Sequence, residues 1–152
     1  MTTTATLPLS ILFEQDETAW LEVMSQLAAE GRYTEMDYSN LSEYLSDMSK
    51  RDRREVFSRL VILLTHLLKW EHRPGHRSGS WRGSILEQRR ELRKLLESGT
   101  LQNHALAVLA EAYADARKQA AADAELSRVV FPLDCRWDLE SLLTDEDDTD
   151  KA

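Results

Sequence analysis

The chain has 152 residues, enough for one domain with a hydrophobic core. Apolar residues make up 42% of it and charged residues 30%, which excludes wholesale disorder. The net charge of −8 is unevenly distributed, because residues 50–94 hold 13 Lys and Arg against 5 Asp and Glu, and the remainder holds 6 against 22. Such asymmetry occurs in proteins that bind polyanions. We favour the alternative that the basic segment pairs with the acidic remainder of its own fold, because the acidic total charge would repel nucleic acid.

Three features of the sequence indicate the cellular compartment. Residues 1–13 lack the basic start of a signal peptide and are predicted to be a flexible N-terminal arm. The single Cys135 cannot form an intrachain disulfide, which favours a reducing environment. The longest apolar stretch, residues 60–70, is interrupted by Thr65, His66 and Lys69 and is too short to cross a bilayer. We therefore expect a cytoplasmic protein without a membrane segment.

Helical periodicity dominates from residue 14 onward. A first helix is expected from an N-cap at Asp16 to a C-terminal stop at Gly31, and a second, short helix from a cap at Asp37 to about Met48. Ser49 and Asp52 resemble a capping box, so a third helix begins there or continues after a kink. This third helix, through residue 71, is apolar around most of its circumference and is predicted to be the buried centre of the fold.

Two further helices follow a polar, basic loop at residues 72–80. Ser78 or Ser80 is expected to cap the fourth, with Trp81, Ile85 and Leu92 inward and its arginines outward, and the fifth is expected at residues 101–123. Residues 129–132 are expected to be a short extended segment, and Asp138 to cap a last turn through residue 143. The acid-rich residues 144–152 are predicted to be a disordered tail. The expectation is an all-α, single-domain bundle of about five main helices, spanning residues 14–143.

Several motifs resemble a bacterial family called domain of unknown function 29. They are FEQDETAW at 13–20, LLKW at 67–70, RSGSWR at 77–82, ILEQRR at 85–90, EAYADAR at 111–117, and Phe131-Pro132 followed by Cys135. The resemblance implies a small all-helical protein and no particular activity. The chain departs from the family pattern in the second helix, where Tyr44, Ser46 and Ser49 stand in place of an acid-rich stretch ending in Gly.

Catalytic and metal motifs are not apparent in the sequence. It has no phosphate-binding Gly loop, HExxH, GxSxG or CxxC. Glu43 and Asp47 share a helix face, and His66 lies on a helix that would pack opposite, but the Glu-x-x-His pairs of helix-bundle metal sites do not occur. We therefore expect no metal, no cofactor and no catalytic residue, and lean against an enzyme.

The basic segment 66–90 is the best candidate for a binding site. It places cations, two indoles and small capping residues near a helix N-terminus, where backbone N–H groups bind anions. The candidate anion-binding residues are Lys69, Arg73, Arg77, Ser78, Ser80, Trp81, Arg82, Arg89 and Arg90. The competing interpretation places the tryptophans in the core and pairs the arginines with internal carboxylates, of which Glu43, Asp47, Glu111 and Asp115 are the candidates.

Three functions remain open on this basis, of which a hydrolase or metal enzyme is the least favoured. The favoured one is a non-catalytic interaction or accessory protein that binds an unknown protein or itself. The alternative is a binder of nucleic acid or another phosphorylated ligand through residues 66–90.

Overall fold

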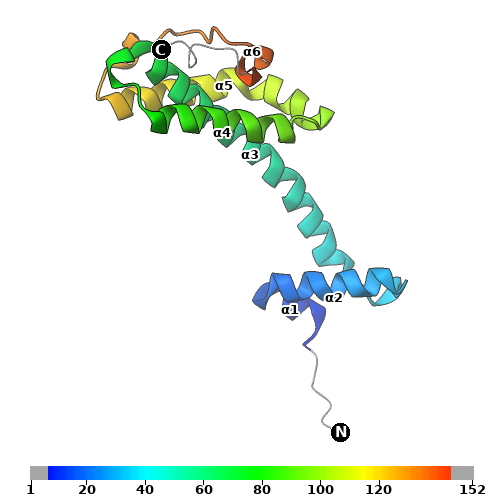
Figure 1. The fold of residues 1–152 in the computed structure, drawn as a ribbon. Helices are drawn as coiled ribbons and strands as arrows, with labels where there is room; N and C mark the ends of the chain where they lie inside the picture. The colour runs from blue at the N-terminus through cyan, green and yellow to red at the C-terminus, as the bar shows by residue number, and fades with distance from the viewer. Residues whose placement is uncertain (1–6, 145–152) are drawn as a thin grey trace. The chain divides into compact units, whose positions relative to one another are not determined.

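The structure is a computed structural model that describes residues 7–144 (Figure 1). The described residues form α-helices and short 3-10 helices and contain no strand, which confirms the all-α expectation. The chain divides into two compact units, residues 1–50 and residues 51–152, here called unit 1 and unit 2. Within the described part, no helix has both the length and the apolar content needed to cross a membrane.

Unit 1 begins with a helical hairpin of α1 (Leu9–Gln15) and α2 (Glu17–Ala29). Asp16 caps α2 as predicted, because its Oδ1 accepts a hydrogen bond from the Ala19 N–H at 3.0 Å. Gly31, at φ 71°, ends the helix, and the N–H groups of Gly31 and Arg32 donate to Ala28 and Leu27 in a Schellman motif. Helix α1 lies partly within the segment expected to be an arm, of which residues 1–6 are outside the described part.

The next helix, α3 (Tyr38–His72), is continuous, so the expectation of a separate short helix ending near Met48 is wrong. A 3-10 turn, η1 (Tyr33–Glu35), precedes it, and Asp37 caps it by accepting from the Asn40 N–H at 3.3 Å. Ser49 does not cap a helix, because it lies inside α3, where its hydroxyl donates to the Ser46 carbonyl of the preceding turn at 3.1 Å. The capping-box pattern therefore lies inside a helix.

The core of unit 1 is small. Among residues 7–50 the buried side chains are Trp20, Met24 and Leu27. The Trp20 ring contacts the rings of Phe13 and Tyr44, with centroids 4.8 and 5.9 Å away, and its Nε1 donates to the Asp37 carboxylate at 3.2 Å. One tryptophan thus links α1, α2 and the start of α3.

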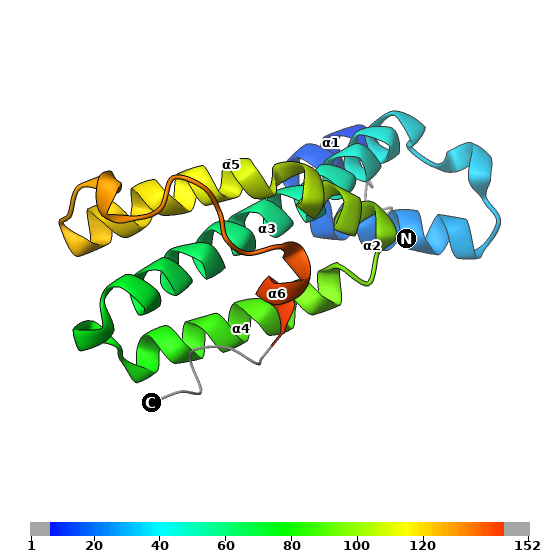
Figure 2. The same cartoon turned by 90° about the horizontal axis from the view of Figure 1, so that it is seen from above.

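Unit 2 contains the second part of α3 with α4 (Gly79–Leu95), α5 (Gly99–Ala124) and α6 (Leu139–Leu143). Helix α3 packs against α4 and α5, as Figure 2 shows. The side chains that α3 buries begin at Val56 and run to Trp70, which confirms that this stretch is the buried centre of the bundle. Small residues of α5, among them Ala105, Ala112 and Ala116, are fully buried against it.

Short segments complete unit 2. η2 (Pro74–His76) joins α3 to α4, and Ser78, Ser98 and Asp138 accept the capping hydrogen bonds of α4, α5 and α6. Residues 129–132 are not an extended segment as expected. Arg128–Val130 forms a 3-10 turn, η3, and Phe131 alone in this stretch is buried. The Tyr113 hydroxyl and the Arg117 Nε hold the turn by donating to the carbonyls of Pro132 and Phe131.

Candidate functional site

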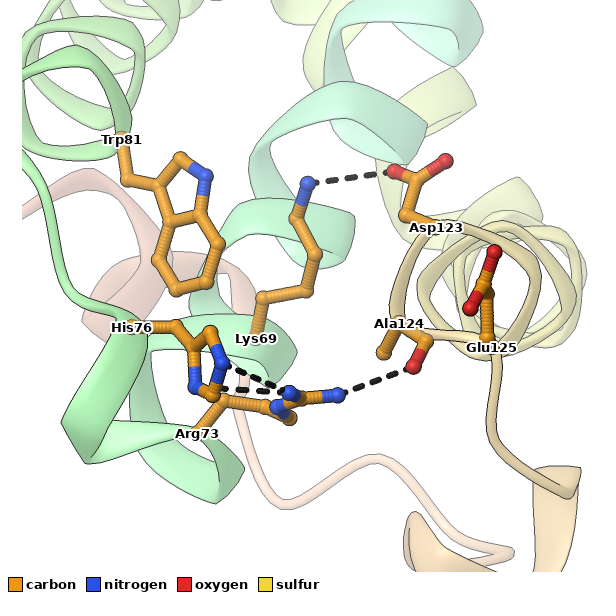
Figure 3. A pocket seen from close by; sticks show the side chains of 7 residues that line it. All are labelled: Lys69, Arg73, His76, Trp81, Asp123, Ala124 and Glu125. Carbon is orange, nitrogen blue, oxygen red and sulfur yellow. Dashed lines mark hydrogen bonds and ion pairs between the residues drawn. The ribbon is translucent and has the colours of Figure 1, made fainter.

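A polar pocket of about 360 Å³ opens in unit 2 where α3, η2, α4 and the end of α5 meet. It is drawn in Figure 3 and is lined by Lys69, Arg73, His76, Trp81, Asp123, Ala124 and Glu125. Three of these residues, Lys69, Arg73 and Trp81, belong to the predicted anion-binding set. The sequence interpretation missed the other four, of which Asp123, Ala124 and Glu125 come from a helix end some fifty residues further along the chain.

Lys69 is held by an ion pair and an aromatic contact within unit 2. Only 8% of the residue is exposed, and its Nζ lies 3.1 Å from Asp123 Oδ2 and 5.1 Å from the centre of the Trp81 ring. Burial raises the pKa of Asp123, but hydrogen bonds from Gln119 and Lys69 outweigh it, so the net pKa lies below the ordinary value. Lys69 and Asp123 therefore form an ionised pair that joins α3 to α5.

Arg73 binds the C-terminal end of α5. Its Nη1 donates to the Ala124 carbonyl at 2.9 Å, and its Nη2 lies 3.0 Å from His76 Nε2 (Figure 3). The adjoining Glu125 ends α5 in the left-handed conformation, at φ 55°. A cation beside the last carbonyls of a helix is favourable because the helix dipole is negative there. Arg73 therefore acts as a C-terminal cap while lining the pocket.

The loop residues are arranged differently from the predicted anion site. The Arg77 Nε donates to the Trp70 carbonyl at 2.9 Å, and its guanidinium lies 4.9 Å from the centre of the Trp70 ring. The Ser78 Oγ accepts from the Trp81 N–H at 3.2 Å. Arg77 and Ser78 therefore hold the connection between α3 and α4, while Ser80 and Arg82 are exposed on the first turns of α4.

We predicted that Arg89 lies on the outer face of α4, but the residue is fully buried. Its Nε donates to the Leu142 carbonyl at 2.8 Å, and the Arg93 Nη1 donates to the Leu143 carbonyl at 2.8 Å. These two arginines bind the C-terminal end of α6. The sequence contains the missing signal, because Arg89 follows Ile85 by four positions and precedes Leu92 by three, on the apolar face.

The remaining predicted residues are on exposed surfaces. Arg90 is exposed, with its Nε 3.6 Å from Glu91 Oε1. The four carboxylates proposed as internal partners are all exposed: Glu43, Asp47, Glu111 and Asp115. Among the predicted cations, Lys69 instead pairs with Asp123. Arg73, Arg77 and Arg89 donate to backbone carbonyls at or near the ends of α5, α3 and α6.

The structure also places the residues that were considered for metal and thiol chemistry. Within residues 7–144 no group of three or more His, Cys, Asp or Glu side chains is arranged to hold a metal ion. Glu43, Asp47 and His66 all belong to α3, so the helix that carries His66 does not pack opposite the other two. Burial raises the pKa of Cys135, whose thiol donates to the Trp137 carbonyl at 3.3 Å, and a protonated thiol is a poor nucleophile.

A second concavity, the apolar groove, lies in unit 1 and was not predicted. It has a volume of about 630 Å³ and lies between α1, the exposed side of α2 and η1. It is lined by Leu7, Leu9, Leu12, Val23, Gln26, Leu27, Arg32 and Glu35. Five of these eight residues are aliphatic, and the charged ones sit together at the η1 end, where Arg32 forms ion pairs with Glu30 and Glu35.

Comparison with known proteins places the chain by its sequence. No curated protein and no solved structure matches it. The family described as "Domain of unknown function DUF29" matches over residues 12–147, which include the described part of both units apart from its first residues. The chain therefore belongs to the DUF29 family.

Proposed function

We propose that this protein is a non-catalytic interaction protein, in which unit 1 binds a helical segment of a partner and unit 2 is the stable body. The observation that carries the proposal is the apolar groove of unit 1, which is open among the described residues although these bury few apolar side chains of the unit. Groove-shaped apolar surfaces are the usual receptors for an amphipathic helix.

The small core of unit 1 supports the same function. Residues 7–50, the described part of this unit, bury three hydrophobic side chains, which give little apolar area to offset the entropy of folding. In the same unit Leu7, Ile11 and Val23 are 49%, 40% and 39% exposed. Binding a partner in the groove would cover Leu7 and Val23 and stabilise the unit by mass action.

A panel of amphipathic helical peptides of basic, neutral and acidic charge tests this proposal on the full chain. Fluorescence anisotropy should detect binding of at least one peptide, and Val23→Asp should abolish it, because a carboxylate would then face the apolar floor. Leu45→Asp is the matched control, since Leu45 is 58% exposed in the same unit but does not line the groove. Binding by none of the peptides, or equal loss in both variants, contradicts the proposal.

A second candidate function is the binding of a small phosphorylated ligand in the polar pocket. The pocket favours it by placing Lys69, Arg73, His76 and the Trp81 ring around one space. Two features weigh against an extended polyanion such as nucleic acid. Lys69 and Arg73 already bind Asp123 and the Ala124 carbonyl, and the carboxylates of Asp123 and Glu125 would repel phosphates.

Titration with inorganic phosphate and with a short oligonucleotide at low salt tests this second function. If the pocket is a binding site, His76→Ala should weaken phosphate binding at nearly unchanged melting temperature, because His76 is exposed. Arg77→Ala is the matched control. It should lower stability by about 1–2 kcal/mol through loss of the hydrogen bond to Trp70, and leave phosphate binding unchanged.

A further inference from the structure

We infer that the partner segment of the apolar groove is a basic amphipathic helix. The inference rests on the proposed function and names the chemistry of the partner. Its support is the combination of an apolar groove, with Glu35 in its lining, and the strongly acidic composition of residues 7–50.

The charge of unit 1 is the first argument. Residues 7–50 contain nine Asp and Glu and two Lys and Arg, which gives a net charge of −7. One of the two cations, Arg32, is already held between Glu30 and Glu35. Hydrogen bonds from Gln26 and Arg32 lower the pKa of Glu30, and one from Arg32 lowers that of Glu35, so both carboxylates are ionised at neutral pH. Such a surface attracts a basic partner and repels an acidic one.

The arrangement of the groove is the second argument. Val23, Gln26 and Leu27 lie on one face of α2 at positions i, i+3 and i+4, and Glu30 follows at i+7 as the C-cap, so this face runs from apolar to acidic. Leu9 and Leu12 of α1 are three residues apart, so they lie on one face of that helix, and both line the same groove. An incoming helix would place aliphatic anchors at i, i+3 or i+4 and i+7 on this floor. Its Lys or Arg side chains would then reach Glu30 and Glu35.

A second copy of unit 1 is a poorer occupant. In a two-fold dimer whose axis passes through the groove, the groove of one copy would meet the groove of the other. Two copies of unit 1 would then bring together two charges of −7 at close range. A basic helix meets no such repulsion.

The test uses full-length protein and three labelled eighteen-residue peptides: an amphipathic Leu/Lys helix, its Leu/Glu counterpart, and a scrambled Leu/Lys sequence of the same composition. The amphipathic basic peptide should bind at least about tenfold more tightly than either of the others, and high salt should weaken it. The scrambled peptide controls for simple charge attraction to an acidic protein.

Two substitutions at the rim should act in opposite directions. Glu35→Gln removes one carboxylate and should weaken the basic peptide several-fold, whereas Arg32→Gln releases Glu30 and Glu35 from their present ion pairs and should strengthen it. Glu43→Gln, an exposed carboxylate of the same unit outside the groove, should leave affinity unchanged. Because one variant gains affinity, loss of folding cannot imitate the expected pattern.

Three results would overturn the inference. Equal binding of basic and acidic amphipathic peptides, abolished by Val23→Asp, would contradict the basic partner while supporting the proposed function. Failure of every peptide to bind would contradict both. A dimer in sedimentation that Val23→Asp dissociates would identify a second copy as the occupant.

Discussion

Helix α3 passes through two regions that differ in how they use it. From Tyr38 to Glu55 it buries no side chain, whereas from Val56 to Trp70 nine of its residues are buried. Unit 2 surrounds the second stretch with α4 and α5 and closes it with Phe131 and α6. Unit 1 relies on Trp20, Met24 and Leu27 and leaves an apolar groove open. The same helix is therefore a core element in one unit and a largely solvated support in the other.

The arginines show the same contrast. In unit 2, Arg73, Arg77, Arg89 and Arg93 donate to backbone carbonyls at or near the ends of α5, α3 and α6, so the basic segment mainly joins elements of its own fold. In unit 1, Arg32 pairs with the exposed carboxylates of Glu30 and Glu35 beside the groove. Exposed ion pairs contribute little to stability and exchange readily for those of a partner.

Removing the Trp20 side chain should have the largest effect. Trp20→Ala deletes the residue that joins α1, α2 and α3 and should cost about 3–5 kcal/mol in unit 1. Amide hydrogen exchange should show α1 and α2 losing protection while α4 and α5 keep theirs. Loss of protection throughout the chain would mean that the two units do not unfold independently.

Leu64→Ala probes unit 2 in the same way. Leu64 is fully buried in the centre of the bundle, and the cavity should lower the free energy of unfolding by about 2–5 kcal/mol. Urea unfolding followed by circular dichroism measures it. A loss below about 1 kcal/mol would show that α3 is not the centre of the core.

Arg89→Met should destabilise unit 2 by about 1.5–3 kcal/mol, because the Leu142 carbonyl loses a charged donor in a buried position. Arg93→Met is the control, since the exposed Arg93 binds the neighbouring carbonyl, and it should cost less than about 1 kcal/mol. Thermal unfolding of both variants compares them. Equal effects would contradict the view that burial of Arg89 makes its contact the stronger.

The smallest effect concerns pH. Burial raises the pKa of Asp37, but hydrogen bonds from Asn40 and Trp20 outweigh it, and the net pKa is lowered. A lowered folded pKa means that the stabilisation is present above the unfolded value of about 3.9 and is lost as pH falls through the folded value. The Trp20 indole N–H resonance should therefore shift in acid, and Asp37→Asn should remove the shift. A resonance unaffected by either change would contradict the hydrogen bond.

Local signals in the sequence predicted much of the fold. Asp16, Ser78 and Asp138 are caps because a short polar side chain before an apolar period satisfies free helix N–H groups, a purely local effect. The family was also recognised from motifs in the chain. The prediction of a break near Met48 was wrong. A serine can cap a helix or donate its hydroxyl to a carbonyl of the preceding turn, as Ser49 does, and the capping pattern does not distinguish the two.

The candidate site was less accessible to prediction. The partners of Lys69 and Arg73 lie at the end of α5, and no local pattern links positions so far apart in the chain. The apolar groove depends on which leucines of α1 and α2 remain uncovered, and periodicity marks both buried and open apolar faces alike. The burial of Arg89 could have been predicted, because its spacing to Ile85 and Leu92 places it on the apolar face of α4.

Hydrogen exchange of the full chain with and without the amphipathic Leu/Lys peptide tests the central claim most directly. The account predicts that the peptide increases protection in α1, α2 and η1, where the groove lies, and leaves α4 and α5 unchanged. Increased protection around the polar pocket of α4 and α5 without a change in α1 and α2, or no change anywhere, would contradict it.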